Sequence, residues 1–194
     1  GSGLEDSTFA SGPGTPNGAK PSPLSVAGAG CASFDGDADW ITLPSVNLPG
    51  DFTFYLWFNT LSISRSALAS SDDGAQYFTL EMNGDGTGAT APGRVAFLVN
   101  GGGTFYVAGN RRGLNDGRWH NLAAVRNGSQ IHIYIDGERD GTANVPGFTT
   151  VGSGGVYLGR EGGTKTNYFN GLIDEVAAWT RALSDAEIGN NCSA

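Results

Sequence analysis

The sequence predicts an all-β fold, specifically a two-sheet antiparallel jelly-roll sandwich with one short C-terminal helical turn. Two observations support this fold class. Glycine is very frequent, at 32 of 194 residues, and stretches with helical periodicity are scarce. Short apolar stretches alternate with turns rich in Gly, Asn, Asp and Ser, which is typical of sandwiches and barrels. The expected strands number about a dozen, which exceeds an immunoglobulin sandwich and suits a jelly roll.

The first 30 residues differ in composition from the rest of the chain. Four prolines lie here among Gly, Ser and Ala, which predicts a linker or an extended N-terminal arm over residues 1–30. Residues 1–3, Gly-Ser-Gly, look like a scar left by a cloning tag. Residues 24–26 are a candidate short edge strand. The β-sandwich itself is expected over residues 31–194.

The clearest strand is Phe52–Asn59, which reads FTFYLWFN. Apolar residues on both of its faces predict a central strand that is covered on both sides. Asn127-Gly128 lies between two alternating stretches and predicts a tight hairpin. Ser184 and Glu187 have the spacing of a capping box, which predicts a helical turn over residues 184–188. The remaining strands are expected, in order, at residues 32–34, 40–43, 66–70, 76–82, 94–99, 104–108, 119–126, 130–135, 143–145, 156–158 and 172–180.

The formal net charge is −8. This acidic balance disfavours nucleic acids and anionic membranes as partners, because both require many Lys and Arg side chains. The sequence also contains no apolar run of about 18 residues, so no membrane insertion is expected.

The two cysteines, Cys31 and Cys192, lie near opposite ends of the expected domain. They either form a disulfide or remain as two buried free thiols. A disulfide would place the protein in an oxidising compartment, which predicts a secreted, extracellular or cell-surface location.

Six motifs, in this order along the chain, resemble the laminin-G-like and pentraxin group of the concanavalin A-like lectin/glucanase fold, over residues 31 to 192. The resemblance implies a jelly roll whose first and last strands lie side by side, which agrees with a Cys31–Cys192 bridge. The motifs are SFDG at 33–36, WITL at 40–43, LPGDFTF at 48–54, GRWHNLA at 117–123, IYIDG at 133–137 and GLIDEV at 171–176.

The resemblance also implies bound calcium. Asp174 lies in an apolar strand, where burial of its carboxylate must be compensated. Either a calcium ion or the backbone N–H groups of a neighbouring loop would compensate it. A second calcium site would use Asp72, Asp73 and Glu161, although glycines follow Glu161 where the family supplies further ligands. The alternative there is a solvated acidic turn. Asp35 begins a run of alternating acids, which either binds a metal ion or forms a polar hairpin.

Sugar sites combine aromatic platforms with polar side chains that hydrogen-bond hydroxyl groups. The alternative for each candidate is a core position for the aromatic residues and a solvated position for the arginines. The candidate ligand-binding residues are Tyr106, Arg111, Arg112, Asn167 and Tyr168, with Tyr77, Phe105 and Phe169 as further exposed aromatics.

Catalysis is not expected. Glycosidases need two carboxylates facing each other, and no predicted strand carries acids at alternate positions on one face. Glu81, for example, is alone on its strand. The expected function is that of an extracellular recognition module that binds carbohydrate, and the module would be part of a larger multidomain protein. Its partner would be a glycan or a cell-surface or matrix protein. The alternatives are a protein–protein adhesion module and a polysaccharide-degrading enzyme of the same fold.

Overall fold

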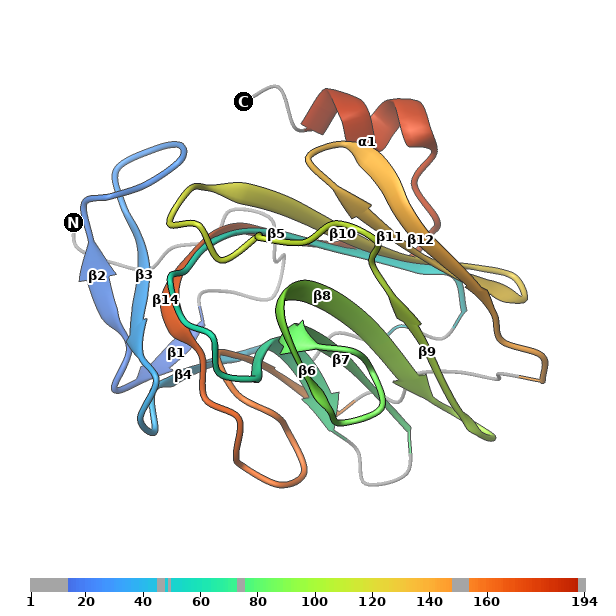
Figure 1. Ribbon diagram of the computed structural model, residues 1–194, viewed down its shortest axis with the longest axis horizontal. Helices are drawn as coiled ribbons and strands as arrows, with labels where there is room; N and C mark the ends of the chain where they lie inside the picture. The colour runs from blue at the N-terminus through green and yellow to red at the C-terminus, as the bar shows by residue number, and fades with distance from the viewer. Residues whose placement is uncertain (1–13, 45–47, 49, 73–75, 148–153, 192–194) are drawn as a thin grey trace.

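The computed structural model describes residues 14–44, 48, 50–72, 76–147 and 154–191. Within these residues the chain forms two antiparallel seven-stranded sheets and one short helix, which confirms the predicted all-β sandwich. Figure 1 shows the sheets as two packed layers. Sheet A has the order β1-β4-β13-β6-β7-β8-β9, and sheet B has the order β12-β11-β10-β5-β14-β3-β2.

The strands of sheet A are β1 (Thr15–Asn17), β4 (Trp40–Leu43), β13 (Gly155–Leu158), β6 (Ser66–Asp72), β7 (Tyr77–Gly84), β8 (Thr90–Asn100) and β9 (Thr104–Ala108). Those of sheet B are β12 (Glu138–Asn144), β11 (Gln130–Ile135), β10 (His120–Asn127), β5 (Phe52–Asn59), β14 (Asn170–Trp179), β3 (Cys31–Asp35) and β2 (Lys20–Ser22). The helix is α1 (Asp185–Asn191).

The described part of the N-terminal arm belongs to both sheets. β1 pairs with β4 in sheet A, and β2 pairs with β3 in sheet B. The chain passes between the sheets at Gly18, whose φ of 80° favours glycine. The edge strand expected at residues 24–26 lies instead at β2, which contains Pro21. An edge strand accepts proline because one row of its N–H groups has no partner strand.

The core lies between the two sheets and is built from alternating inward-facing residues. Phe52, Phe54, Leu56 and Phe58 of β5 are all fully buried there. The other face of β5 is also covered, as its sequence predicted. Tyr55 packs with Tyr134 and with apolar residues of the C-terminal segment, Leu183 and Ile188.

The local predictions for the hairpin and the helix are confirmed. Asn127 pairs with Gln130 across the tight turn between β10 and β11. The Glu187 backbone N–H donates to Ser184 Oγ over 3.3 Å, and the Ser184 N–H donates to Glu187 Oε2 over 2.8 Å. This reciprocal capping box begins α1, which runs slightly longer than the expected turn.

The two sheets present different outer faces. α1 lies on the outer side of sheet B, where its Ile188 joins the second apolar cluster (Figure 1). The outer face of sheet A instead carries polar and aromatic side chains. A binding site on a sheet face is therefore expected on sheet A.

Candidate functional site

Strand alternation places a polar row on the outer face of sheet A. On β7, Phe78, Leu80 and Met82 point into the core, so the alternate residues Tyr77, Thr79 and Glu81 point outward. The strand register continues the row through Thr79 to neighbouring strands on both sides. In order across the sheet, the aligned outward residues are Tyr157, Ser70, Thr79, Leu98 and Tyr106.

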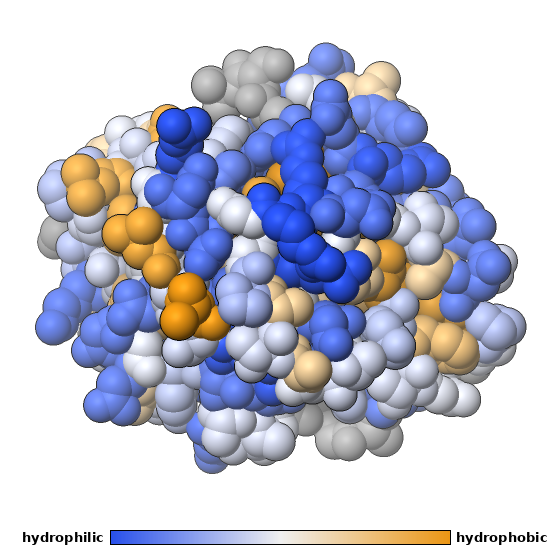
Figure 2. Space-filling view, in the orientation of Figure 1, coloured by the Kyte–Doolittle hydropathy of each residue, from blue (hydrophilic) through white to orange (hydrophobic). Residues whose placement is uncertain are grey.

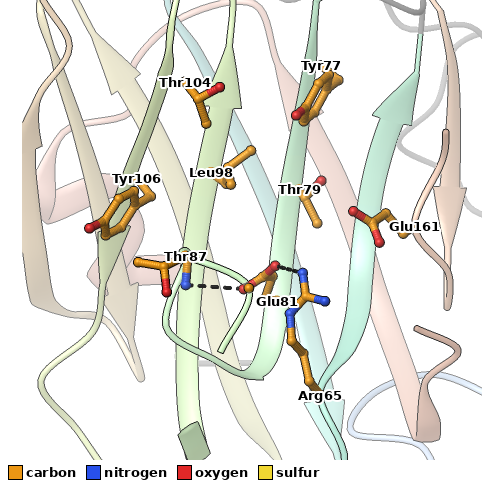
Figure 3. A pocket seen from close by; sticks show the side chains of 11 residues that line it. Arg65, Tyr77, Thr79, Glu81, Thr87, Leu98, Thr104, Tyr106 and Glu161 are labelled. Carbon is orange, nitrogen blue, oxygen red and sulfur yellow. Dashed lines mark hydrogen bonds and ion pairs between the residues drawn. The ribbon is translucent and has the colours of Figure 1, made fainter. Parts of the chain in front are cut away.

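A pocket of about 380 Å³ opens on this face, and we call it the Tyr106 pocket. Its volume lies at the small end of the range for ligand sites. Figure 3 shows outward side chains of neighbouring strands that converge on it. The Tyr106 side chain is 46% exposed, which is unusual for a large aromatic residue in a sandwich. The lining consists of Arg65, Tyr77, Thr79, Glu81, Gly86, Thr87, Gly88, Leu98, Thr104, Tyr106 and Glu161.

Glu81 links two walls of the pocket. Its Oε1 forms an ion pair with Arg65, and its Oε2 accepts the Gly86 backbone N–H over 3.2 Å (Figure 3). A Cβ atom on Gly86 would lie 2.7 Å from the Tyr106 ring, and the Gly86 φ is 83°. The turn between β7 and β8 therefore packs against the base of the Tyr106 side chain and requires glycine at this position.

Glu161 forms the opposite wall and is positioned by its own loop. Its Oε2 accepts hydrogen bonds from Thr164 Oγ1 over 3.0 Å and from Asn167 Nδ2 over 2.6 Å. Its backbone N–H donates to the Thr166 carbonyl over 3.0 Å. Among the described residues, Oε1 of Glu161 accepts no hydrogen bond, and it is therefore available to a ligand.

A second aromatic group lies on the same sheet face, toward β4. The Arg160 guanidinium lies 3.8 Å from the Tyr157 ring centre and 5.1 Å from the Trp40 ring centre. Tyr168 packs against Trp40 with ring centres 6.4 Å apart. Arg160 Nη1 also donates to the carbonyls of Glu161 and Gly162, over 3.2 and 3.0 Å. The stacked arginine thus anchors the loop that carries Glu161.

The candidate ligand-binding residues do not all lie in the Tyr106 pocket. Tyr106 lines the pocket, and Asn167 stands behind it as the donor that positions Glu161. Tyr168 belongs to the neighbouring aromatic group. Phe169, considered as an exposed aromatic, is fully buried in the core, and Phe105 packs against that core from β9.

Arg111 and Arg112 lie away from the pocket. Arg111 contacts two carboxylates beside sheet B, those of Asp136 at 3.0 Å and of Glu138 at 2.6 Å. Its guanidinium is thereby committed to ion pairs, while Arg112 is exposed. Sequence reasoning missed Arg65, Thr79 and Glu81 as pocket residues. For Thr79 and Glu81, the available signal was the alternation of polar and apolar residues along β7.

An ionised cluster surrounds His120 at the start of β10. His120 Nδ1 lies 3.0 Å from Asp136 Oδ2, and Nε2 lies 3.2 Å from Asp116 Oδ1. The hydrogen bond to Asp136 is the main cause that raises the pKa of His120. These groups stabilise the protonated imidazole. They do not line the Tyr106 pocket, so we assign the cluster a structural role.

The Asp174 carboxylate is surrounded by hydrogen-bond donors. Oδ2 accepts the backbone N–H groups of Val26 and Ala27, at 2.9 and 3.5 Å, and Oδ1 accepts the Glu175 N–H at 2.9 Å. This arrangement is the alternative considered for Asp174, in which a neighbouring loop compensates its burial. Calcium requires six to eight oxygen ligands, so N–H groups directed at the carboxylate do not fit the ion.

The other acidic candidates do not lie close together in the described part of the structure. Asp35 Oδ1 accepts the Asp37 N–H over 2.8 Å within a turn, and Glu161 faces the pocket. Asp73 lies outside the described residues, as does the side chain of Asp72. No group of three or more His, Cys, Asp or Glu side chains that could hold a metal ion occurs in the described part of the chain. Calcium therefore stays a prediction.

Of the two cysteines in the expected disulfide, Cys31 lies in the described part of the chain. Cys31 is buried on β3, and its Sγ lies 3.1 Å from the Leu24 carbonyl oxygen. Cys192 lies outside the described residues. The pairing of the two cysteines stays a prediction.

Comparison with known proteins supports the architecture. A family profile described as "Concanavalin A-like lectin/glucanases superfamily" matches residues 35–189. The chain belongs to this superfamily. The match spans the pocket-forming strands and the Glu161 loop of this concanavalin A-like protein, which is laminin G-like in type. A sequence search among curated proteins finds no significant match.

Three solved structures illustrate the likeness in fold. Domain 4 of AbnA, an extracellular GH43 arabinanase from Geobacillus stearothermophilus in complex with arabinotriose, has a TM-score of 0.77 and 18% identity, covering 98% of this chain and 93% of that one. A heptameric SAP-like pentraxin from Limulus polyphemus has a TM-score of 0.64 and 16% identity, covering 83% and 80%. The binding domain of Paraclostridial Mosquitocidal Protein 1 has a TM-score of 0.71 and 13% identity, covering 92% and 46%.

A further neighbour is the receptor-binding domain of a botulinum neurotoxin C/D mosaic serotype, with a TM-score of 0.69 and 10% identity. The superfamily description also includes glucanases. At these identities the likeness shows the fold alone. In the described residues, no helix has the length and apolar character needed to cross a membrane.

Proposed function

We propose that this protein is an extracellular, non-catalytic recognition module that binds carbohydrate in the Tyr106 pocket. The observation that carries the proposal is Tyr106, an aromatic residue that is 46% exposed on the sheet face that α1 does not cover. A sugar ring presents apolar C–H groups on its face and hydroxyl groups around its edge. An aromatic platform and fixed hydrogen-bonding groups match these two features.

The polar lining of the pocket suits hydroxyl groups. Thr79 and Thr104 supply hydroxyls that can donate and accept, while Thr87 Oγ1 donates to Asp85 Oδ1 over 2.7 Å and offers a ligand only an acceptor. Glu161 Oε1 supplies a further acceptor. The surface in Figure 2 is mostly hydrophilic, and apolar residues form small groups on the face in view. The threonine hydroxyls and Glu161 Oε1 of the pocket therefore suit a hydroxyl-rich ligand.

The contacts of Glu81 argue against glycoside hydrolysis, which needs two accessible carboxylates. The Glu81 side chain is 3% exposed, and both its oxygens accept a bond from within the protein. A retaining glycosidase needs an accessible nucleophile, and an inverting one needs a free carboxylate that activates water. Glu81 meets neither requirement, so we assign it to holding the pocket together.

The comparisons add a first ligand to test. The AbnA domain with the same fold was solved with arabinotriose, and other neighbours are binding domains of larger toxins. We therefore propose an oligosaccharide as the ligand and a larger extracellular protein as the parent. The test is a glycan array that includes arabinotriose, followed by calorimetry on the strongest ligand. Saturable binding is expected, and no binding to any glycan would contradict the proposal.

A protein-adhesion role is the second candidate, and one loop favours it. Leu61 and Ile63 are 76% and 67% exposed, on the segment between β5 and β6. Asn83 Nδ2 donates to the carbonyls of Ser62 and Ser64 over 2.8 and 3.0 Å, so the loop is held in place while its apolar side chains face solvent. Replacing both with serine would remove capture of a protein partner and leave sugar binding unchanged.

Calcium binding is a separate prediction that rests on the family resemblance. Asp174 lies on sheet B and does not line the Tyr106 pocket, so the proposed sugar site does not depend on a metal ion at Asp174. A glycan array repeated with calcium and with a chelator separates the two ideas. Equal binding under both conditions is expected.

A further inference from the structure

We propose that Glu161 makes the Tyr106 pocket selective for uncharged sugars and excludes acidic ones, such as uronic acids and sulfated glycans. This inference rests on the proposed function and specifies the ligand class of the same site. Two features of the pocket support this selectivity: the formal charges of its lining, and the hydrogen bonds that those charged side chains already make.

The charged lining carries one net negative charge, because it contains one arginine and two glutamates. The arginine is already engaged in an ion pair, because its Nη2 donates to Glu81 Oε1. Arg65 is paired with Glu81, whose side chain is 3% exposed and whose charge therefore needs this partner. An acidic sugar that recruited Arg65 would leave the Glu81 carboxylate buried and without its counter-ion.

The second carboxylate faces the ligand space. Figure 3 shows Glu161 on the wall across from Tyr106, with its carboxylate directed toward the pocket. Because Thr164 and Asn167 both bind Oε2, the carboxylate cannot rotate away without losing two hydrogen bonds. Oε1 is thus held as an acceptor for a ligand hydroxyl, and the same negative charge repels a ligand carboxylate or sulfate.

The surroundings strengthen this preference. The hydrogen bond to Glu81, followed by the negative charges of Glu81, Glu161 and Asp85, raises the pKa of Arg65 against the opposing effect of burial. The whole chain carries a net charge of −8, which adds a long-range repulsion toward polyanionic glycans at low salt.

The test compares matched ligands on wild-type protein and on the Glu161→Gln variant. The array carries arabinotriose and other neutral oligosaccharides, and each uronic acid oligosaccharide as both free acid and methyl ester. Glutamine keeps an oxygen that can accept the bonds from Thr164 and Asn167, so the loop should stay folded. Glu138→Gln is the control, since it removes the same charge from a 78% exposed carboxylate on β12, away from the pocket.

We expect wild-type protein to bind neutral ligands and to bind free acids at least about tenfold more weakly than their methyl esters, the size of one lost charge-assisted contact. Glu161→Gln should reduce neutral binding and bring the acid close to its ester, while Glu138→Gln should change neither. Equal wild-type binding of acid and ester, or unchanged selectivity in Glu161→Gln, would overturn the inference but leave sugar binding intact. Absence of binding to every glycan would overturn the proposed function itself.

Discussion

Arg65 and Glu81 form an ion pair within the Tyr106 pocket, and the Glu81 side chain is almost completely buried. Glu81 also binds the Gly86 backbone, which lies against the Tyr106 ring. One carboxylate thereby joins the segment before β6, strand β7 and the turn that follows β7. The pocket shape depends on this pair, although neither member needs to touch the ligand.

Replacing Glu81 with alanine should strongly destabilise the protein. Arg65 would remain next to the pocket without its counter-ion, and loss of one partner of a buried pair costs about 3–5 kcal/mol. Chemical denaturation measures the change in the free energy of unfolding. The double variant Arg65→Met with Glu81→Leu should lose less stability than Glu81→Ala, because it leaves no unpaired charge. Equal losses would contradict this account.

Tyr106 should contribute its ring more than its hydroxyl group to sugar binding. Tyr106→Ala removes an apolar platform whose burial contributes about 1.5–3 kcal/mol, which corresponds to roughly a tenfold to hundredfold loss of affinity. Tyr106→Phe keeps the ring and should bind within a fewfold of wild type. Calorimetry with the strongest array ligand measures both. Leu24→Ala, which truncates another exposed side chain outside the pocket lining, is the control.

The two histidines should affect the pH dependence of stability in opposite directions. The bond to Asp136 raises the pKa of His120, so its stabilising contribution is complete below its unfolded pKa of about 6.5 and is lost as pH rises through the folded value. Burial lowers the pKa of His132, so its contribution is present above about pH 6.5 and is lost as pH falls through the folded value.

Melting curves measured between pH 5 and 8 test both histidines, because this range of about three units is centred on the free histidine pKa. His120→Asn should lose most stability, relative to wild type, at the acidic end of the range. Wild type should lose stability on acidification as His132 becomes protonated. The His132→Asn variant should not show this part of the loss. Identical pH profiles for both variants and wild type would mean that neither histidine is coupled to folding.

Asp174 should matter for stability without calcium. Asp174→Ala leaves the N–H groups of Val26 and Glu175 without their acceptor, which costs about 1–3 kcal/mol. The predicted calcium site is tested in the same experiment, by melting wild type with calcium and with a chelator. A higher melting temperature with calcium that disappears in Asp174→Ala would show that the carboxylate does bind the ion.

The sequence alone was sufficient for the fold class and for several local features. The two-sided apolar strand at Phe52–Asn59, the Asn127-Gly128 hairpin and the Ser184–Glu187 capping box all depend on residues close together in the chain. Alternation and capping are local properties, so they can be read from sequence. Tyr106 was also correctly singled out as an exposed aromatic residue.

The tertiary structure decided which polar residues share a site. Arg65, Glu81, Tyr106 and Glu161 meet because β7 lies between β6 and β8, and because the loop after β13 folds over the same face. The partner of Asp174 comes from Val26, 148 positions away. Arg111, a candidate sugar contact, is committed to acids near the β11–β12 turn. Strand order and loop placement follow from how the whole chain buries its apolar faces, and periodicity within one segment carries no information about them.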